Sequence, residues 1–217
     1  MSQILVTGAN GFVGRGLCDA LRTRGIAVVP AVRKINQASD VAVGDLSAAT
    51  DWRLALQNCD AVIHLAARVH VMNETASDPL DAFRSVNVEA TVNLARQAIT
   101  AGVSRFVFVS SVKVNGEETS ERPYTAFDEP APTDPYGISK LEAEVALKKL
   151  AEETGLEVVI VRPPLIYGPG VRANFQRLMQ LVKMGLPLPL GAINNRRSMV
   201  AVSYTHLRAH ETKANIV

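Results

Sequence analysis

The residues whose types and spacing best suit chemistry stand in the stretch YGISK, where Tyr136 and Lys140 are four positions apart. If the stretch is helical, this spacing places both side chains on one face. A phenol has a pKa of about 10 and is a poor base at neutral pH, but a neighbouring ammonium stabilises the phenolate and lowers that pKa. Ser110 and Ser111 end the apolar run FVFVSS, where a serine hydroxyl could hold the oxygen that gains or loses a proton. A chance Tyr–Lys pair on a helix is common, so this pair indicates a catalytic site only together with the serines at the end of the preceding apolar run.

A second candidate site is the glycine triplet of TGANGFVG, which consists of Gly8, Gly11 and Gly14. The triplet follows a first apolar run and opens an amphipathic stretch, as expected between a strand and a helix. Glycines permit a tight turn and let backbone N–H groups approach a pyrophosphate, which the start of a helix also favours. An ordinary glycine-rich turn is the alternative, but the position after a first strand makes a dinucleotide site the more specific interpretation.

The end of the expected second strand bears on the choice of cofactor. A carboxylate that binds the adenosine ribose is expected there, and the sequence AVVPAVRK supplies Arg33 and Lys34 instead. Arg33 could pair with a 2′-phosphate, or it could be solvated. The pattern therefore predicts NAD(P) as cofactor and slightly favours NADP(H).

The elements that must position these residues alternate between short apolar runs and longer amphipathic stretches. Strands that are apolar on both faces and separated by helices indicate a parallel sheet covered on both sides. The sequence therefore predicts an α/β fold, a Rossmann-like doubly wound parallel sheet with ligands at the carboxyl ends of its strands. The expected strands are residues 3–8, 26–32, 41–45, 60–67, 105–111 and 156–163, and the expected helices are residues 12–25, 52–59, 78–102 and 134–155.

The composition argues against several other classes of protein. Of the 217 residues, 47% are hydrophobic and 20% are charged, as in a soluble globular protein. A net charge of +2 without a basic run argues against nucleic-acid and membrane partners. No signal peptide is recognisable and no apolar stretch approaches about 20 residues, so a cytoplasmic location is expected. Cys18 and Cys59 are expected to be reduced, and His64 and His70 lack metal-ligand spacing, so no metal is expected.

Six motifs in a fixed order carry a resemblance to a known family: TGANGFVG, HLAA, SVNVEATVNL, FVFVSSVKVNG, YGISK and RPPLIYGPG. From about Ser2 to about Ala201 the chain resembles the extended short-chain dehydrogenase/reductase family, and within it the nucleotide-sugar epimerase/dehydratase branch. The resemblance implies an NAD(P)-binding Rossmann domain at residues 1–165 and a partial substrate-binding region at 166–201. It also implies that the full-length protein is a homodimer built from the helices around 79–101 and 135–154, with a nucleotide sugar as the small-molecule partner.

The resemblance assigns roles to individual positions. Ser111, rather than Ser110, would be the catalytic serine, and Tyr136 would be the general acid/base. Lys140 would lower the pKa of Tyr136 and hold the cofactor ribose. The implied cofactor contacts are Gly8, Asn10, Gly11, Phe12, Val13, Gly14, Arg33, Asp45, Leu46, Leu65, Ala66, Ala67, Asn87, Tyr136, Lys140 and Pro163. The implied substrate contacts are Ser111, Lys113, Asn174 and Arg197.

The chain also departs from the family pattern. Leu165 stands where many members have an asparagine that helps to hold the substrate, and Lys113 and Asn115 replace a small residue and an aromatic one. Lys113 could reach a phosphate or an acetamido group of the substrate, although a solvated lysine is the commoner case.

The stretches RVHVMNE, SSVKVNGE and RPPLIYGPG most resemble bacterial enzymes of surface-polysaccharide sugar synthesis. They imply hydride exchange at C4 of a UDP-sugar. The reaction would be either 4-epimerisation or reduction of a UDP-4-keto-6-deoxy-N-acetylhexosamine, since the same residues serve both. A non-catalytic NADP-binding sensor or scaffold is the alternative from another class, although such proteins typically lose the tyrosine or the lysine.

The stretch VSYTHLRAHET contains His206 and His210, whose spacing on a helix could bind a metal. The stretch continues no pattern of the family, and over eleven consecutive codons it resembles the translation of a transposase-type sequencing adapter. Residues 202–217 are therefore expected to be a non-native tail that follows a truncated gene, and the histidine pair is not expected to bind a metal. On this hypothesis the chain itself could be inactive.

Overall fold

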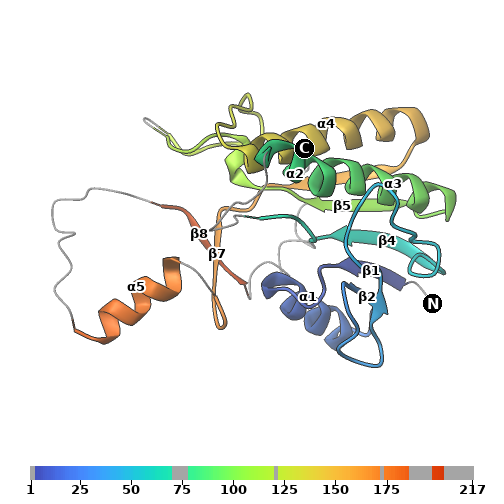
Figure 1. Ribbon diagram of the computed structural model, residues 1–217, viewed down its shortest axis with the longest axis horizontal. Helices are drawn as coiled ribbons and strands as arrows, with labels where there is room; N and C mark the ends of the chain where they lie inside the picture. The colour runs from blue at the N-terminus through green and yellow to red at the C-terminus, as the bar shows by residue number, and fades with distance from the viewer. Residues whose placement is uncertain (1–2, 70–77, 120–121, 172–173, 186–196, 203–217) are drawn as a thin grey trace.

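The computed structural model describes residues 3–69, 78–119, 122–171, 174–185 and 197–202. Its centre is a six-stranded sheet with the order β3-β2-β1-β4-β5-β6, in which every neighbouring pair is parallel (Figure 1). The strands are β1 (Gln3–Thr7), β2 (Ala27–Val32), β3 (Val41–Ala42), β4 (Cys59–His64), β5 (Arg105–Val109) and β6 (Glu157–Val161). This order is that of a doubly wound sheet, so the predicted Rossmann-like fold is confirmed.

Helical segments connect the strands of this sheet. They are α1 (Phe12–Thr23), α2 (Pro79–Arg84), the π-helical turn η1 (Ser85–Glu89), α3 (Ala90–Thr100), the 3₁₀ turn η2 (Val112–Val114) and α4 (Pro135–Thr154). The sequence predicted one helix over residues 78–102, whereas the structure has α2, η1 and α3 in succession. A π-helical turn inside a helix often marks a functional site, and here it contains Asn87.

The hydrophobic core lies on both faces of the sheet, because successive side chains of a strand point to opposite faces. Leu5 of β1 belongs to a buried cluster that includes Leu94 of α3 and Leu147 of α4. Its neighbour Val6 belongs to a second cluster, which includes Leu17 of α1. The alternation explains why β1 is apolar at consecutive positions.

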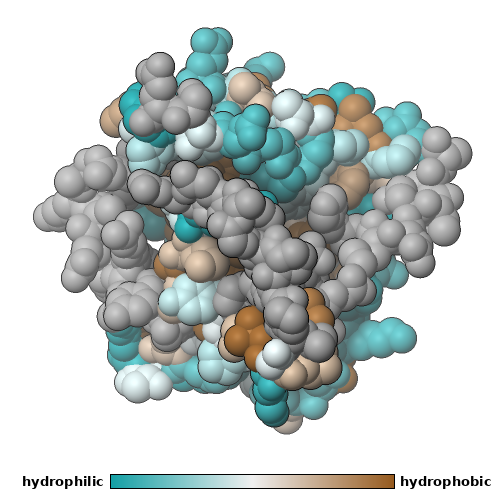
Figure 2. Space-filling view, turned by 90° about the vertical axis from the view of Figure 1, so that its left-hand side faces the viewer, coloured by the Kyte–Doolittle hydropathy of each residue, from teal (hydrophilic) through white to brown (hydrophobic). Residues whose placement is uncertain are grey.

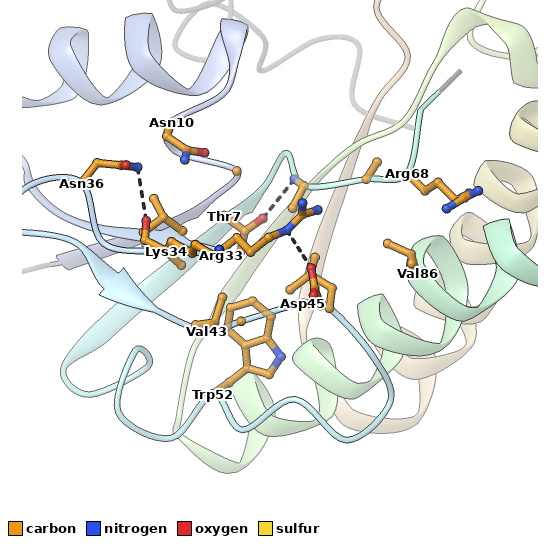
Figure 3. A pocket seen from close by; sticks show the side chains of 17 residues that line it. Thr7, Asn10, Arg33, Lys34, Asn36, Val43, Asp45, Trp52, Arg68 and Val86 are labelled. Atoms are coloured by element: carbon orange, nitrogen blue, oxygen red, sulfur yellow. Dashed lines mark hydrogen bonds and ion pairs between the residues drawn. The ribbon is translucent and has the colours of Figure 1, made fainter. Parts of the chain in front are cut away.

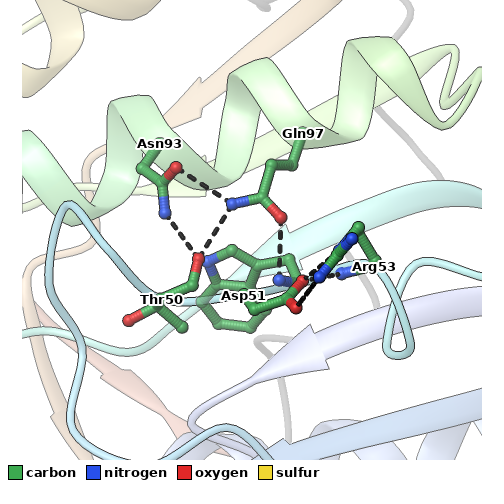
Figure 4. A network of polar contacts seen from close by, with 6 residues as sticks. Thr50, Asp51, Arg53, Asn93 and Gln97 are labelled. Atoms are coloured by element: carbon green, nitrogen blue, oxygen red, sulfur yellow. Dashed lines mark hydrogen bonds and ion pairs between the residues drawn. The ribbon is translucent and has the colours of Figure 1, made fainter.

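The predicted helix over residues 52–59 is wrong, since this segment forms turns that end at Asn58, which has a φ of +57°. Side chains of the neighbouring helix α3 bind the backbone where these turns begin (Figure 4). Asn93 and Gln97 both donate to the carbonyl of Thr50 at 2.8 Å, and Gln97 accepts from the backbone N–H of Trp52 at 2.8 Å. These bonds anchor the backbone of Thr50 and Trp52, where the turns begin, to α3.

A smaller region follows the main sheet and consists of β7 (Leu165–Tyr167), α5 (Asn174–Lys183) and β8 (Met199–Ala201). Strands β7 and β8 pair in parallel in a sheet of their own. Figure 2 views the molecule from this side and shows hydrophobic residues among hydrophilic ones. The exposed apolar side chains in and just after α5 include Met179, Val182 and Met184.

Among the residues that the structure describes, every helix is too short or too polar to span a bilayer. Within the same ranges, no cluster of three or more His, Cys, Asp or Glu side chains could hold a metal ion. Cys18 and Cys59 are both buried free thiols. The pair His206 and His210, the rest of the expected tail from residue 203, and His70 lie outside the described residues.

Candidate active site

The glycine loop after β1 depends on the absence of side chains. Gly8 has a φ of +65°, a conformation that L-residues with a side chain rarely adopt. A Cβ at Gly14 would lie 2.2 Å from the carbonyl oxygen of Gly8, so glycine is required where α1 passes the loop. No side chain caps α1 at Gly11. The backbone N–H groups at the start of α1 are therefore suited to bind a pyrophosphate.

A cavity of about 690 Å³ opens beside this loop (Figure 3). It lies beyond the carboxyl ends of β1, β2 and β4, where a doubly wound sheet binds its ligands. The predicted cofactor residues that line it are Gly8, Asn10, Arg33, Asp45, Leu46, Ala66 and Ala67. Other lining residues were not predicted as cofactor contacts from the sequence, although Lys34 was noted beside Arg33; they include Lys34, Asn36, Trp52, Arg68 and Val86. Lys34 directly follows Arg33 and could have been inferred, whereas Trp52 reaches the cavity through the unpredicted turns.

Two of the lining residues form an ion pair across the cavity. The Nε atom of Arg33 lies 2.7 Å from Oδ1 of Asp45, and both side chains are mostly exposed. An exposed pair of this kind contributes little to stability. Arg33 is thus held at the end of β2 without being buried, so its guanidinium remains accessible to an anionic ligand.

The buried His64 at the end of β4 is a structural residue. The hydroxyl of Thr7 accepts from the N–H groups of Leu65 and Ala66 at 3.2 Å and lies 2.7 Å from Nδ1 of His64. Nε2 of His64 lies 3.0 Å from the hydroxyl of Thr91. Burial, and secondarily the charge of Lys140, lowers the pKa of His64 to about 3. A neutral imidazole between these hydroxyls fixes the backbone of Leu65 and Ala66 beside the glycine loop.

The buried Asn87 of η1 connects this backbone to α4. Its amide nitrogen donates to the Ser139 hydroxyl at 2.9 Å and to the Arg68 carbonyl at 3.0 Å, and its side-chain oxygen accepts from the Arg68 N–H at 2.8 Å. Ser139 in turn donates to the carbonyl of Tyr136 at 2.8 Å. Asn87 was predicted to contact the cofactor. The structure shows its side chain bonded to the backbone of Arg68 and to Ser139, and through Ser139 to the backbone of Tyr136.

Ser111 and Tyr136 meet at the carboxyl end of β5. The Ser111 side chain hydrogen-bonds Tyr136, whose ring also packs edge-on against Phe83 with 6.2 Å between ring centroids. Burial raises the pKa of Tyr136, while the hydrogen bond from Ser111 opposes the shift. Ser110 has a buried hydroxyl without a partner among the described residues.

Lys140 is buried one turn along α4, on the same side as Tyr136. Its ammonium lies 3.9 Å from the centroid of the Phe108 ring, a cation–π contact. Burial lowers the pKa of Lys140 to about 7, and the charge of Glu144 opposes this shift. Glu144 is itself buried and accepts from Arg162 at 2.5 to 3.2 Å. Lys140 was predicted to lower the pKa of Tyr136; in the structure burial raises that pKa, and the opposing contributions come from the Ser111 hydrogen bond and the charge of Lys113.

Of the remaining predicted positions, Lys113 and Pro163 lie near Ser111 and the others lie in or beside the glycine loop or in the smaller region. Lys113 binds Glu117 at 2.7 Å and Asp134 at 2.5 Å. The carbonyl of Pro163 accepts from the N–H of Val112 at 3.1 Å, next to Ser111. Asn174 begins α5, and the exposed Arg197 precedes β8, so both belong to the smaller region outside the main sheet. The predicted contacts Gly11, Phe12, Val13, Gly14 and Leu65 belong to the glycine loop, the start of α1 and the segment after β4.

Comparisons with known proteins agree with this geometry. The chain is 49% identical over 207 residues to the UDP-glucose 4-epimerase of Vibrio cholerae, covering 93% of this chain and 63% of that protein. The solved structure of MoeE5 with UDP-glucuronic acid and NAD is similar with a TM-score of 0.80 at 30% identity, over 96% of this chain and 71% of that one. UDP-glucuronic acid 4-epimerase from Bacillus cereus, solved with UDP-glucuronic acid and NAD, gives a TM-score of 0.81 at 27% identity, over 99% and 75% of the two chains. The chain thus spans less than two thirds of its Vibrio cholerae relative.

The fold and the glycine loop together define a dinucleotide-binding protein of the Rossmann class. The sequence pattern of the NAD dependent epimerase/dehydratase family matches residues 4–203, and the chain belongs to that family.

Proposed function

We propose that the protein is an enzyme that epimerises C4 of a UDP-sugar with NAD(P) as cofactor. The observation that carries this proposal is the hydrogen bond between Ser111 and Tyr136 at the carboxyl end of β5, the strand next to β4, whose own carboxyl end borders the cavity. The 49% identical relative from Vibrio cholerae, a UDP-glucose 4-epimerase, supports the choice of substrate.

The roles of the side chains follow from their positions. Ser111 would hold O4 of the sugar, and Tyr136 would take the O4 proton and return it. When bound, the nicotinamide supplies the acceptor and donor of the C4 hydride. A phenol with a raised pKa keeps its proton at neutral pH, which suits donation to a ketone oxygen. The buried ammonium of Lys140 would hold the cofactor ribose and stabilise the phenolate when Tyr136 acts as a base.

The proton-transfer role is tested by Tyr136→Phe, which keeps the ring and removes the hydroxyl. The conversion of UDP-glucose to its C4 epimer should fall at least about 100-fold, because no other group replaces the proton carrier. Binding of NAD should change little. A variant that keeps more than a few per cent of wild-type turnover would contradict the role, and bound cofactor without any hydride exchange across a panel of UDP-sugars would favour the sensor or scaffold.

Cofactor choice is a finer proposal, and it rests on Arg33. We propose that NADP(H) is slightly preferred, since the end of β2 presents a guanidinium and no carboxylate. In titrations, Arg33→Ser should weaken NADP(H) binding about ten-fold and leave NAD(H) binding within a factor of two, which is the size of one charge-assisted contact. Wild-type protein that binds NAD(H) ten-fold more tightly than NADP(H) would overturn the preference.

Arg33 at the end of β2 also favours a second candidate function, the reduction of a UDP-4-keto-6-deoxy-N-acetylhexosamine by NADPH. A reductase consumes its cofactor, so oxidation of NADPH in step with loss of the ketone identifies it. In either case we propose a role in surface-polysaccharide sugar synthesis, a cytoplasmic location, and a homodimer that forms through α2, α3 and α4. Asn174 and Arg197 are proposed to contact the nucleotide diphosphate.

A further inference from the structure

Lys113 connects two segments that carry the proposed catalytic side chains. Its backbone N–H donates to the Ser111 hydroxyl at 3.2 Å, in the turn η2 that follows β5. Its ammonium lies 2.5 Å from Oδ2 of Asp134 and 2.7 Å from Glu117. The Lys113 side chain is one third exposed and the Asp134 side chain about one fifth, so the Lys113–Asp134 ion pair is partly shielded from water.

Asp134 is the N-cap of α4, the helix that presents Tyr136. Its other oxygen, Oδ1, accepts from the N–H of Gly137 at 2.6 Å, and this bond fixes the first turn of the helix. One carboxylate therefore binds Lys113 with one oxygen and the start of α4 with the other. Tyr136 lies between Asp134 and Gly137 in the sequence, within the turn that this cap orders.

Close packing of the backbone reinforces the connection. A Cβ at Gly137 would lie 2.9 Å from the Lys113 carbonyl oxygen and 3.1 Å from Oδ1 of Asp134. The turn η2 and the first turn of α4 are thus in direct contact, with no room for a side chain between them. A shift of the Lys113 turn would be passed to Ser111 on one side and to Tyr136 on the other.

We propose that Lys113 is a positioning residue, which holds the Ser111 turn against the capped first turn of α4 and so sets the geometry between Ser111 and Tyr136. The inference rests on the proposed function, in which these two side chains hold O4 and move its proton. It also explains why a lysine stands in this loop together with an aspartate at the N-cap. Lys113 then acts through Ser111 and Tyr136 without touching the substrate.

The ion pair also affects the charge balance around Tyr136. Asp134 raises the pKa of the phenol and Lys113 lowers it, both less strongly than burial. Loss of the Lys113 charge would leave the Asp134 carboxylate unbalanced and raise the phenol pKa further. The other charged groups near Tyr136 are Lys140 one turn along α4, Arg68 above the Phe83 ring, and the Arg84–Glu142 ion pair between α2 and α4.

The kinetic test compares Lys113→Met with Lys113→Arg, and with Lys148→Met as a control at an exposed lysine of α4. With UDP-glucose as substrate, Lys113→Met should lower kcat about ten-fold and change KM less than about two-fold, because misplacement of reacting groups affects the chemical step. Lys113→Arg should recover most of kcat, and Lys148→Met should match the wild type. Asp134→Asn keeps a capping oxygen for α4 but loses the charge that pairs with Lys113. The double variant Asp134→Asn, Lys113→Met should therefore have nearly the same kcat as Asp134→Asn alone.

A second readout does not depend on turnover. Alkaline titration by ultraviolet absorbance measures the pKa of Tyr136 when the curve of the matching Tyr136→Phe form is subtracted, with NAD bound in both. In Lys113→Met this pKa should be higher than in the wild type by about half a unit or more. A ten-fold rise in KM with kcat unchanged would show instead that Lys113 binds the substrate and would overturn the inference. An unshifted titration with wild-type kinetics would overturn it as well. If neither this chain nor the full-length protein converts a UDP-sugar, the proposed function fails, while the titration still decides whether Lys113 acts on Tyr136.

Discussion

The buried ammonium of Lys140 is costly to the folded protein. Its pKa falls to about 7 on folding, so between about pH 10 and pH 7 the unfolded chain binds a proton that the folded chain does not. Stability is therefore lost as the pH decreases through this window. The cost is consistent with a functional residue, since an ordinary lysine is rarely fully buried.

We expect Lys140→Met to be more stable than the wild type at pH 7, by at least about 1 kcal/mol, and to lack epimerase activity. The gain should shrink at pH 10, because the penalty for giving up the proton on folding falls as the pH approaches the ordinary lysine pKa of about 10.4. Urea unfolding at the two pH values measures the difference, with Lys148→Met as a control that shows neither effect. A Lys140→Met protein that is less stable at pH 7 would contradict the burial cost.

At the scale of elements, the glycine loop and α1 come into close backbone contact. A Cβ at Gly14 would meet the carbonyl oxygen of Gly8 at 2.2 Å, and backbone atoms cannot move aside as a flexible side chain can. We expect Gly14→Ala to destabilise the protein by about 1–3 kcal/mol and to abolish NAD binding, as measured by urea unfolding and calorimetry.

A matched control for Gly14→Ala is Gly25→Ala at the other end of α1. Gly25 has a φ of +73°, and no atom lies within 4 Å of a Cβ added there. This control should lose about 1 kcal/mol through backbone strain and still bind NAD. A Gly14→Ala protein that binds NAD as tightly as the wild type would show that the glycine loop tolerates the displacement of its backbone by the added methyl group.

The sequence predicted the elements whose cause is local and missed those whose cause is tertiary. The glycine triplet sits between a strand and a helix as expected, because turn and helix start depend on neighbouring residues. Residues 52–59 have a helical pattern but form turns, and their start at Thr50 and Trp52 is bound to Asn93 and Gln97 of α3, residues distant in the sequence. For the same reason the spacing of Tyr136 and Lys140 was evident, while the burial that governs both pKa values was not.

At the scale of the whole molecule, α4 presents an apolar side chain to solvent. Val145 is 59% exposed in the middle of that helix. If the proposed homodimer forms through α2, α3 and α4, burial of this side chain against the partner would contribute to association.

Val145→Asp should then shift the protein from dimer to monomer, since an unpaired carboxylate is costly to bury at an interface. Light scattering at several protein concentrations measures the change. Leu54→Asp is the matched control, because Leu54 is also exposed but lies in the turns before β4. A wild-type chain that is monomeric at all concentrations would contradict the dimer.

The hydrogen bonds around His64 have a further consequence. The N–H groups of Leu65 and Ala66 donate to the Thr7 oxygen, so the Thr7 hydroxyl proton must point to Nδ1 of His64. The other ring nitrogen of His64, Nε2, then carries a proton and donates to Thr91. Thr91 donates to the Asn87 carbonyl, and the Asn87 side chain continues through Ser139 to Tyr136. Every donor along this path faces the same way. No single hydroxyl can rotate without leaving a buried neighbour unpaired. The series of hydrogen bonds therefore holds the backbone beside the glycine loop in a fixed position relative to α4.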